Sequence, residues 1–138
     1  MITLQGSGIN RWVIVAGAGF ALAAVMTGAF AAHGLKHLLD AYSLDLIETA
    51  ARYQMYHAIA LLIVGIFSTI PQFSPRWLNL AAVAFILGIV LFSGSLYMLA
   101  LSGIKWLGAI TPLGGGAFIL GWGALIIAVL KHPTQTTH

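Results

Sequence analysis

The chain has 138 residues, of which 60% are hydrophobic and 7% charged, and its mean hydropathy is +0.99. A water-soluble domain carries about 25% charged residues, so this composition excludes an ordinary soluble enzyme, a disordered segment and a nucleic-acid-binding domain. Six Lys and Arg against three acids give a net charge of +3, but they form no basic run that would contact a phosphate backbone.

The charged residues divide most of the chain into four long apolar stretches. A helix needs about 20 apolar residues to cross the hydrocarbon core of a membrane. These stretches are apolar all round, whereas the strands of a membrane barrel alternate in hydrophobicity, so helices are favoured. The sequence therefore predicts an all-α integral membrane protein, with one four-helix transmembrane domain over residues 1–138. The predicted spans are 12–32, 53–70, 77–101 and 112–130.

Small residues recur at helical spacing along the first, third and fourth spans. Lipid tails are as apolar as leucine, so membrane helices associate through close backbone approach and polar contacts. We therefore expect these small residues to face neighbouring helices. The expected packing positions are Gly17, Gly28, Gly88, Gly114 and Gly121.

The segment between Lys36 and Arg52 differs from the spans because it holds all three acids of the chain. Its leucines fall roughly on one helical face, which predicts a short amphipathic helix lying at the membrane interface between spans one and two. A solvated connector is the alternative. Asp40 or Ser43 would cap the helix at its N-terminus.

Prolines and tryptophans mark several positions in the second half of the chain. Pro71 and Pro75 bracket a short loop after the second span. The Thr111-Pro112 pair predicts a helix start, with Thr111 as N-cap and the proline at the first helical position. Pro133 is expected to stop the last helix. Trp122 lies near the middle of the fourth span, where its indole N–H needs a partner.

Four spans place both ends of the chain on one side of the membrane. We call this side A and the opposite side B. Arg11, Arg76 and Lys131 lie on side A, and Lys36, Arg52 and Lys105 lie on side B. Because the counts are equal, the positive-inside rule does not choose an orientation. The free amino terminus favours cytoplasmic ends.

Polar side chains within the spans gather toward side B. Unpaired polar groups are costly in hydrocarbon, so we expect them to converge, with His33 and His57 on facing sides of spans one and two. Arg52 is expected to pair with Glu48, four residues earlier, or with a carbonyl at a helix end. The candidate residues of this cluster are His33, Glu48, Arg52, Tyr53, Gln54, Tyr56, His57, Ser95, Tyr97 and Thr111.

Several chemical interpretations of the cluster stay open, and we favour a structural polar cluster. His33 and His37 have the spacing of two metal ligands on one helical face, but no third ligand lies nearby in the sequence. His33 and His57 have similar predicted depths and would hold a haem between two helices. A lipid headgroup, a quinone or another small ligand is the remaining interpretation. No catalytic residue, metal or cofactor is assigned.

Four motifs, in order, carry a resemblance to a known family. They are Gly28-Ala29-Phe30-Ala31-Ala32-His33-Gly34-Leu35-Lys36, Arg52-Tyr53-Gln54-Met55-Tyr56-His57-Ala58, Phe92-Ser93-Gly94-Ser95-Leu96-Tyr97, and Ile110-Thr111-Pro112-Leu113-Gly114-Gly115 with Gly121-Trp122. Over nearly its whole length the chain resembles the small inner-membrane family typified by the bacterial YgdD and YwdK proteins, which has mitochondrial relatives among eukaryotes. The resemblance implies a four-helix inner-membrane protein and no established activity. His37 departs from the lysine expected there, which weakens a His33–His37 metal pair.

Three functional hypotheses follow. The first is a non-enzymatic membrane protein with an accessory or scaffold role, acting through membrane lipids or protein partners, as a homo-oligomer or within a larger membrane complex. The second is an oligomeric small-solute transporter or channel, although spans three and four lack charged residues for a filter. The third is a membrane enzyme, or a haem- or quinone-binding protein, that uses His33, Arg52 and His57. We favour the first hypothesis.

Overall fold

The computed structural model describes residues 9–131, and every regular element in this part of the chain is helical. Four helical segments are long and apolar enough to cross a membrane, which confirms the predicted all-α fold with four spans. In chain order the elements are α1 (Ile9–His33), η1 (Leu35–His37), α2 (Ala41–Phe67), α3 (Pro75–Gly88), η2 (Ile89–Ser93), α4 (Gly94–Ser102), η3 (Lys105–Ala109) and α5 (Thr111–Leu130). The predicted stop at Pro133 lies outside the described residues.

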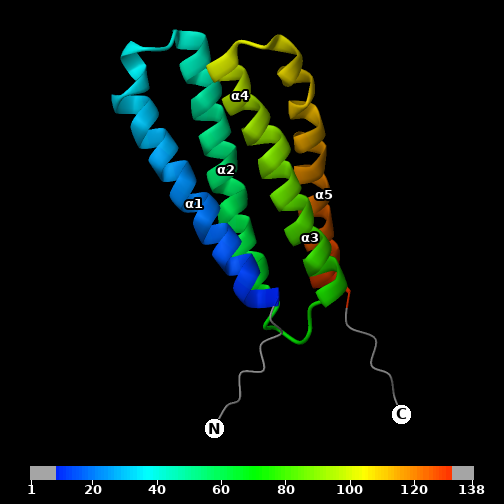
Figure 1. Cartoon of the computed structure of the whole chain (residues 1–138). Coiled ribbons are helices and arrows are strands. Elements are labelled where there is room, and N and C mark those ends of the chain that lie inside the picture. The colour runs from blue at the N-terminus through cyan, green and yellow to red at the C-terminus, as the bar shows by residue number, and fades with distance from the viewer. Residues whose placement is uncertain (1–8, 132–138) are drawn as a thin grey trace, which may run out of the picture.

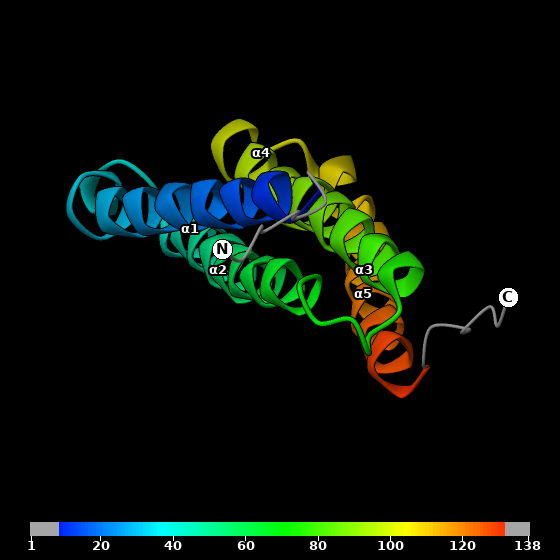
Figure 2. The same ribbon diagram turned by 90° about the horizontal axis from the view of Figure 1, so that it is seen from below.

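The helices form two antiparallel hairpins. The first joins α1 to α2, and the second joins α5 to a third span that runs from α3 through η2 to α4. The third span also packs against α2 and so connects the two hairpins. The start of α1 and the end of α5 lie at the same end of the molecule (Figure 1). Seen from that end, α1 and α5 are the outer helices (Figure 2).

The second span begins much earlier than the sequence predicts. Helix α2 starts at Ala41, not at Tyr53, so the segment expected to form a separate interfacial helix is the first part of α2. No proline or glycine interrupts this segment, and its residues Ile47 and Ala50 are buried, so packing continues the helix toward side B. Asp40 caps α2 as predicted, because its Oδ1 accepts the backbone N–H of Ser43 at 2.8 Å.

The third span contains a π-helical segment, η2, near its middle. Such a segment widens the helix by one residue and is frequent at functional sites. At its end, the buried Ser93 donates its hydroxyl to the carbonyl oxygen of Ala50 in α2, at 2.7 Å. The span ends at Gly103, whose φ of 71° suits glycine and closes the helix.

The start of α5 corrects one prediction. The helix begins at Thr111 with Pro112 in its first turn, but no side chain caps it. The Thr111 hydroxyl instead shares a hydrogen bond with the hydroxyl of Ser95, at 2.7 Å between the oxygens. Thr111 therefore ties α5 to α4 and does not act as an N-cap.

Close contact between helices occurs at four of the five expected glycines. A Cβ atom at Gly17 would lie 2.9 Å from the carbonyl oxygen of Ala58, and one at Gly88, Gly114 or Gly121 would collide with a phenylalanine of the facing helix. The expectation for Gly28 is wrong. A Cβ there has no neighbour within 4 Å, because a cavity of about 460 Å³ separates α1 from the start of α2 at this level.

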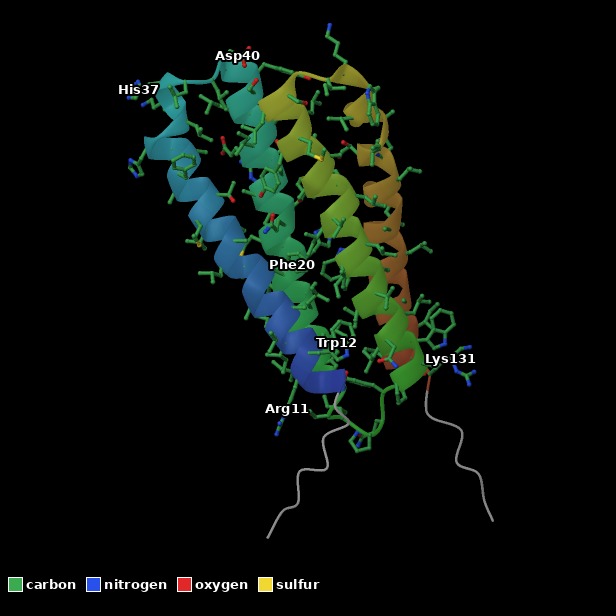
Figure 3. The ribbon with its side chains drawn as sticks, in the orientation of Figure 1. Arg11, Trp12, Phe20, His37, Asp40 and Lys131 are labelled. Atoms are coloured by element: carbon green, nitrogen blue, oxygen red, sulfur yellow. The ribbon has the colours of Figure 1, made fainter. Side chains whose placement is uncertain are left out.

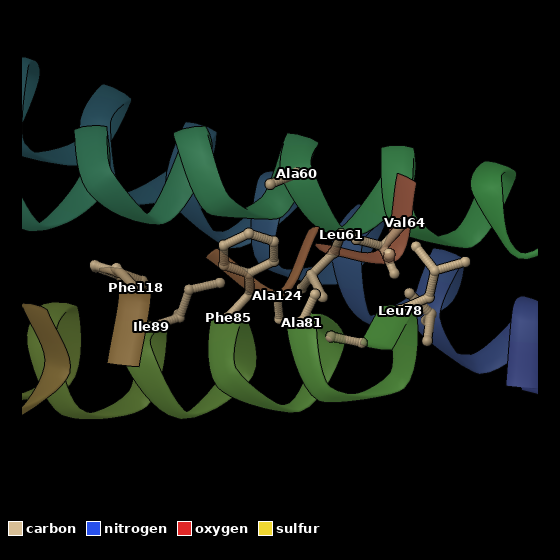
Figure 4. Close-up of a cluster of buried hydrophobic side chains, with 12 residues drawn as sticks. Ala60, Leu61, Val64, Leu78, Ala81, Phe85, Ile89, Phe118 and Ala124 are labelled. Atoms are coloured by element: carbon tan, nitrogen blue, oxygen red, sulfur yellow. The ribbon is translucent and has the colours of Figure 1, made fainter. Parts of the chain in front are cut away.

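The main apolar core lies between α2, the third span and α5. Phe85 is fully buried at its centre, with Leu61 of α2 and Ile89 of η2 beside it; Figure 4 shows these side chains facing each other across the two helices.

At the ends of the bundle, Arg11, Trp12 and Lys131 mark one surface while His37 and Asp40 mark the other (Figure 3). The Lys131 Nζ also lies 5.5 Å from the centroid of the Trp77 ring.

Candidate functional site

His57 is a buried imidazole on α2, 4% exposed, and both of its ring nitrogens have partners. Its Nε2 lies 3.1 Å from Nε1 of Trp122, and its Nδ1 lies 2.7 Å from the carbonyl oxygen of Tyr53. An indole N–H only donates, so Nε2 accepts and the single proton of the neutral ring sits on Nδ1, which donates to the Tyr53 carbonyl. The two contacts assign one tautomer and leave no nitrogen free.

Aromatic rings surround this imidazole. It stacks on Phe118 of α5 with 3.5 Å between ring centroids and 7° between planes. Phe85 of the third span lies against it at 5.6 Å, and Tyr53 is stacked at 6.4 Å on the same helix. Aromatic stacking of this kind adds to the energy of burial, so the imidazole belongs to a rigid aromatic wall.

A groove of about 730 Å³ runs along this wall between α2 and α5; we call it the α2–α5 groove. Its outer residues Tyr56, Ile119 and Trp122 are exposed, so it opens sideways from the helices. No charged side chain lines it. The lining residues are Tyr53, Tyr56, His57, Ile59, Phe92, Gly115, Phe118, Ile119 and Trp122.

The groove lies near the middle of helices α2 and α5. At about 1.5 Å per residue, His57 is roughly 15 Å from the side-A end of α2 at Phe67, and Trp122 is roughly 12 Å from the end of α5 at Leu130. Half of the hydrocarbon thickness is also about 15 Å. His57 therefore lies about half a hydrocarbon thickness from the side-A end of α2, and α2 extends further toward side B than expected.

His33 is the predicted cluster residue that the structure places elsewhere. It is the exposed last residue of α1, whereas His57 is buried near the middle of α2, so the two do not face each other. A haem between these histidines is not supported, because they differ in depth and the nitrogens of His57 are occupied. Within residues 9–131, no group of three or more potential metal-ligating side chains occurs.

Other predicted cluster residues do meet, on the side-B half of the molecule. Gln54 donates its Nε2 to the carbonyl oxygen of Phe20 in α1, at 2.8 Å, and accepts the hydroxyl of Tyr97 on Oε1, at 2.8 Å. One side chain thus joins α1, α2 and α4. With the Ser95–Thr111 bond, these contacts support the structural interpretation of this part of the cluster.

The predicted pair between Arg52 and Glu48 is present. The Arg52 Nη2 lies 2.8 Å from the Glu48 Oε1, and both side chains are exposed. Glu48 is one turn nearer to side B than Arg52, so the guanidinium reaches toward the membrane surface, as long basic side chains do. The pair is a surface feature and does not line the α2–α5 groove.

Sequence reasoning missed the α5 side of the groove. Phe118 and Trp122 stand four residues apart and share one helical face with Gly115, which is the spacing that places side chains together. That spacing was the available signal. It gives the face of α5 but not which residues of α2 lie opposite, because the rotation of one helix against another depends on packing throughout the bundle.

Comparison with known proteins identifies the family. A family model described as "Protein of unknown function (DUF423)" matches residues 27–115. A UPF0382 membrane protein of Staphylococcus aureus (strain bovine RF122 / ET3-1) is 49% identical over 118 residues, which are 86% of this chain and 94% of the relative. A UPF0382 membrane protein of Staphylococcus saprophyticus is 48% identical over 118 residues, which are 86% of this chain and 96% of the relative.

A UPF0382 membrane protein of Staphylococcus haemolyticus is 47% identical over 118 residues, again 86% of this chain and 94% of the relative. No solved structure matches the chain significantly. The relatives are named membrane proteins, in agreement with the four apolar helices of this structure. The chain is therefore a multi-pass membrane protein that belongs to the DUF423 family, a family of unknown function.

Proposed function

We propose that this protein is a non-enzymatic membrane protein that holds a lipid-soluble molecule in the α2–α5 groove. The observation that carries the proposal is the groove itself: about 730 Å³, lined mainly by aromatic and aliphatic side chains, at mid-depth and open to the side. Ligand pockets are typically concave, largely apolar and 300–1,000 Å³ in volume. A molecule that reaches this groove from the bilayer never has to leave hydrocarbon.

The polar groups near the groove support binding rather than catalysis. A general base needs a free lone pair within reach of its substrate. The lone pair of His57 Nε2 accepts the indole N–H of Trp122, and the Nδ1 proton is held by the Tyr53 carbonyl. Arg52, the anion clamp of the enzyme hypothesis, is paired with Glu48 away from the groove.

The proposal also includes the location of the protein, the side of the membrane on which its ends lie, and its relatives. We place it in the bacterial inner membrane with both ends in the cytoplasm, and we relate it to the YgdD and YwdK proteins and their mitochondrial relatives. The family motifs support the inner membrane, the antiparallel arrangement of the four helices supports both ends on one side, and the free amino terminus favours the cytoplasm as that side. An accessory role, in which the bound molecule is presented to a second copy or to another membrane protein, fits a groove that opens sideways.

A pair of glycines allows a sharp test of the groove. A Cβ at either Gly115 or Gly116 has no neighbour within 4 Å, so the backbone at both positions leaves room for the start of a side chain. Gly115 lines the groove, whereas Gly116 does not. Gly115→Leu therefore fills the groove, and Gly116→Leu is a matched control with the same added volume one residue away.

Native mass spectrometry of protein released from membranes into mild detergent measures the bound molecule. We expect a retained lipid-soluble molecule on the unmodified protein and on Gly116→Leu, and its loss from Gly115→Leu. Equal retention by all three proteins, or a bare unmodified protein, would contradict the proposal. Circular dichroism of both variants confirms that they are folded.

A further inference from the structure

The residues that line the α2–α5 groove carry uncharged polar groups, among them the hydroxyls of Tyr53 and Tyr56. The His57 and Trp122 ring nitrogens are used by each other and by the Tyr53 carbonyl. The hydroxyls of Tyr53 and Tyr56 have no hydrogen-bond partner within residues 9–131. A phenol O–H is a good donor, and an unpaired hydroxyl is costly in hydrocarbon. The groove thus favours a ligand that brings acceptors.

The lack of charged lining residues argues against a charged headgroup in the groove. The lining residues include no Asp, Glu, Lys or Arg. A phosphate or ammonium group near the bilayer centre would be strongly unfavourable without a partner charge. A plain hydrocarbon chain would be tolerated, but it would leave the tyrosine hydroxyls unsatisfied. The ligand chemistry that matches is neutral, with carbonyl oxygens and a long apolar tail.

The exposed aromatic rings of the groove also favour a ligand that contains a flat ring. His57 and Phe118 are buried and cover each other face to face, so the rings that remain exposed are those of Tyr53, Tyr56 and Trp122. Tyr53 packs on Phe92 with 4.8 Å between centroids. Flat rings gain most from offset stacking or edge contacts with such a surface. An acyl chain makes no such ring–ring contact.

From these features we infer that the molecule held in the α2–α5 groove is a quinone with a hydrocarbon tail. The ring lies against the aromatic wall, its carbonyl oxygens accept the hydroxyls of Tyr53 and Tyr56, and the tail extends into the bilayer. This inference rests on the proposed function of the groove. It concerns binding alone and assigns no electron transfer to the protein.

Trp122 provides a built-in probe, because quinones quench tryptophan fluorescence on close contact. The chain has four tryptophans, and Trp122 is the one that lines the groove. A variant with Trp12, Trp77 and Trp106 changed to Phe keeps Trp122 as the single reporter. Reconstituted in phosphatidylcholine vesicles, it is titrated with a short-tailed menaquinone and, separately, with a phosphatidylcholine brominated on its acyl chain.

We expect menaquinone to quench Trp122 to a plateau at low mole fraction. Changing both Tyr53 and Tyr56 to Phe keeps the rings and removes the donors, so the half-saturating mole fraction should rise about eightfold, the effect of two membrane hydrogen bonds of average strength. Tyr42→Phe, at the exposed start of α2 and outside the groove, is the matched control and should change nothing.

The outcomes separate this inference from the proposed function. In one outcome, quenching by menaquinone rises linearly without a plateau, while Gly115→Leu abolishes quenching by the brominated lipid and Gly116→Leu does not. The groove then holds an acyl chain, and the quinone inference is overturned. Quenching by both probes that is unaffected by Gly115→Leu overturns the inference and the groove function together. If the single-tryptophan variant fails to fold, the same titrations are made on the unmodified chain and on Trp122→Phe. The difference in quenching between the two proteins then gives the contribution of Trp122.

Discussion

Trp122 donates its indole N–H to Nε2 of His57 over 3.1 Å, and this contact joins α5 to α2 at the centre of the transmembrane region. Tryptophan is enriched at membrane surfaces, where its N–H meets water or headgroups. Trp122 lies near the middle of its span, away from the membrane surfaces, and His57 of another helix provides the acceptor for its N–H. The bond also fixes the tautomer of His57, so one contact satisfies two otherwise costly groups.

Removing the N–H of Trp122 should lower the stability of the bundle slightly and allow His57 to adopt both neutral tautomers. Trp122→Phe keeps an aromatic ring in place, and we expect the free energy of unfolding to fall by about 0.6 kcal/mol, the average for a membrane hydrogen bond. The imidazole ¹⁵N NMR spectrum of the unmodified protein should show a protonated Nδ1 and a bare Nε2, with mixed tautomers in the variant. A protonated Nε2 in the unmodified protein would contradict the assigned bond.

Local patterns in the sequence were sufficient for the architecture. The apolar stretches between charges give the four spans, Asp40 is a cap because it directly precedes the amphipathic segment, and Glu48 and Arg52 pair because they stand four residues apart. Each of these features involves residues close in the chain. The geometry of a single helix therefore decides them.

Features that depend on contacts between helices were predicted less well. The segment after Asp40 has the composition of an interfacial helix, and burial of Ile47 and Ala50 against other helices decides that it continues into α2. His57 and Trp122 are 65 residues apart. Their pairing requires the rotation and axial shift of α5 against α2, which no local pattern specifies. Because α2 starts at Ala41, His57 lies near the middle of the helix, whereas His33 is the last residue of α1.

The contact between α5 and the third span predicts opposite effects at two nearby glycines. A Cβ at Gly114 would collide with backbone atoms of Phe92, which cannot turn aside as a side chain would. We expect Gly114→Ala to lower the free energy of unfolding by about 1–3 kcal/mol, the usual cost of overpacking. Gly116→Ala has open space around its Cβ and should be neutral or slightly stabilising, because alanine favours helix.

Unfolding of both alanine variants in the same detergent, followed by circular dichroism, gives the comparison. Equal stability of the two variants would show that α5 does not approach the third span as closely as the structure has it. Gly28→Ala extends the comparison to α1, where the open space beside Gly28 predicts no loss of stability.

The cap of α2 predicts a pH dependence at the side-B surface. The Ser43 side chain and then the Ser43 backbone N–H hold the pKa of Asp40 below its usual value of 3.8, because both interact favourably with the carboxylate. A lowered pKa in the folded state means that the cap contributes its full stability above pH 3.8. That contribution is lost as the pH falls through the lower folded pKa.

Amide hydrogen exchange at Ser43 measures the cap directly. In the unmodified protein, we expect the protection of this amide to fall once the pH drops below the folded pKa of Asp40, since a protonated carboxyl is a weaker acceptor. Asp40→Asn retains a side-chain oxygen without a titrating charge, so its protection should not change over the same range. Ser43→Ala removes the larger influence on the carboxyl and should move the pKa of Asp40 back toward 3.8 in a ¹³C NMR titration. Protection at Ser43 that is equally pH-independent in the unmodified protein and in Asp40→Asn would show that the carboxylate does not cap α2.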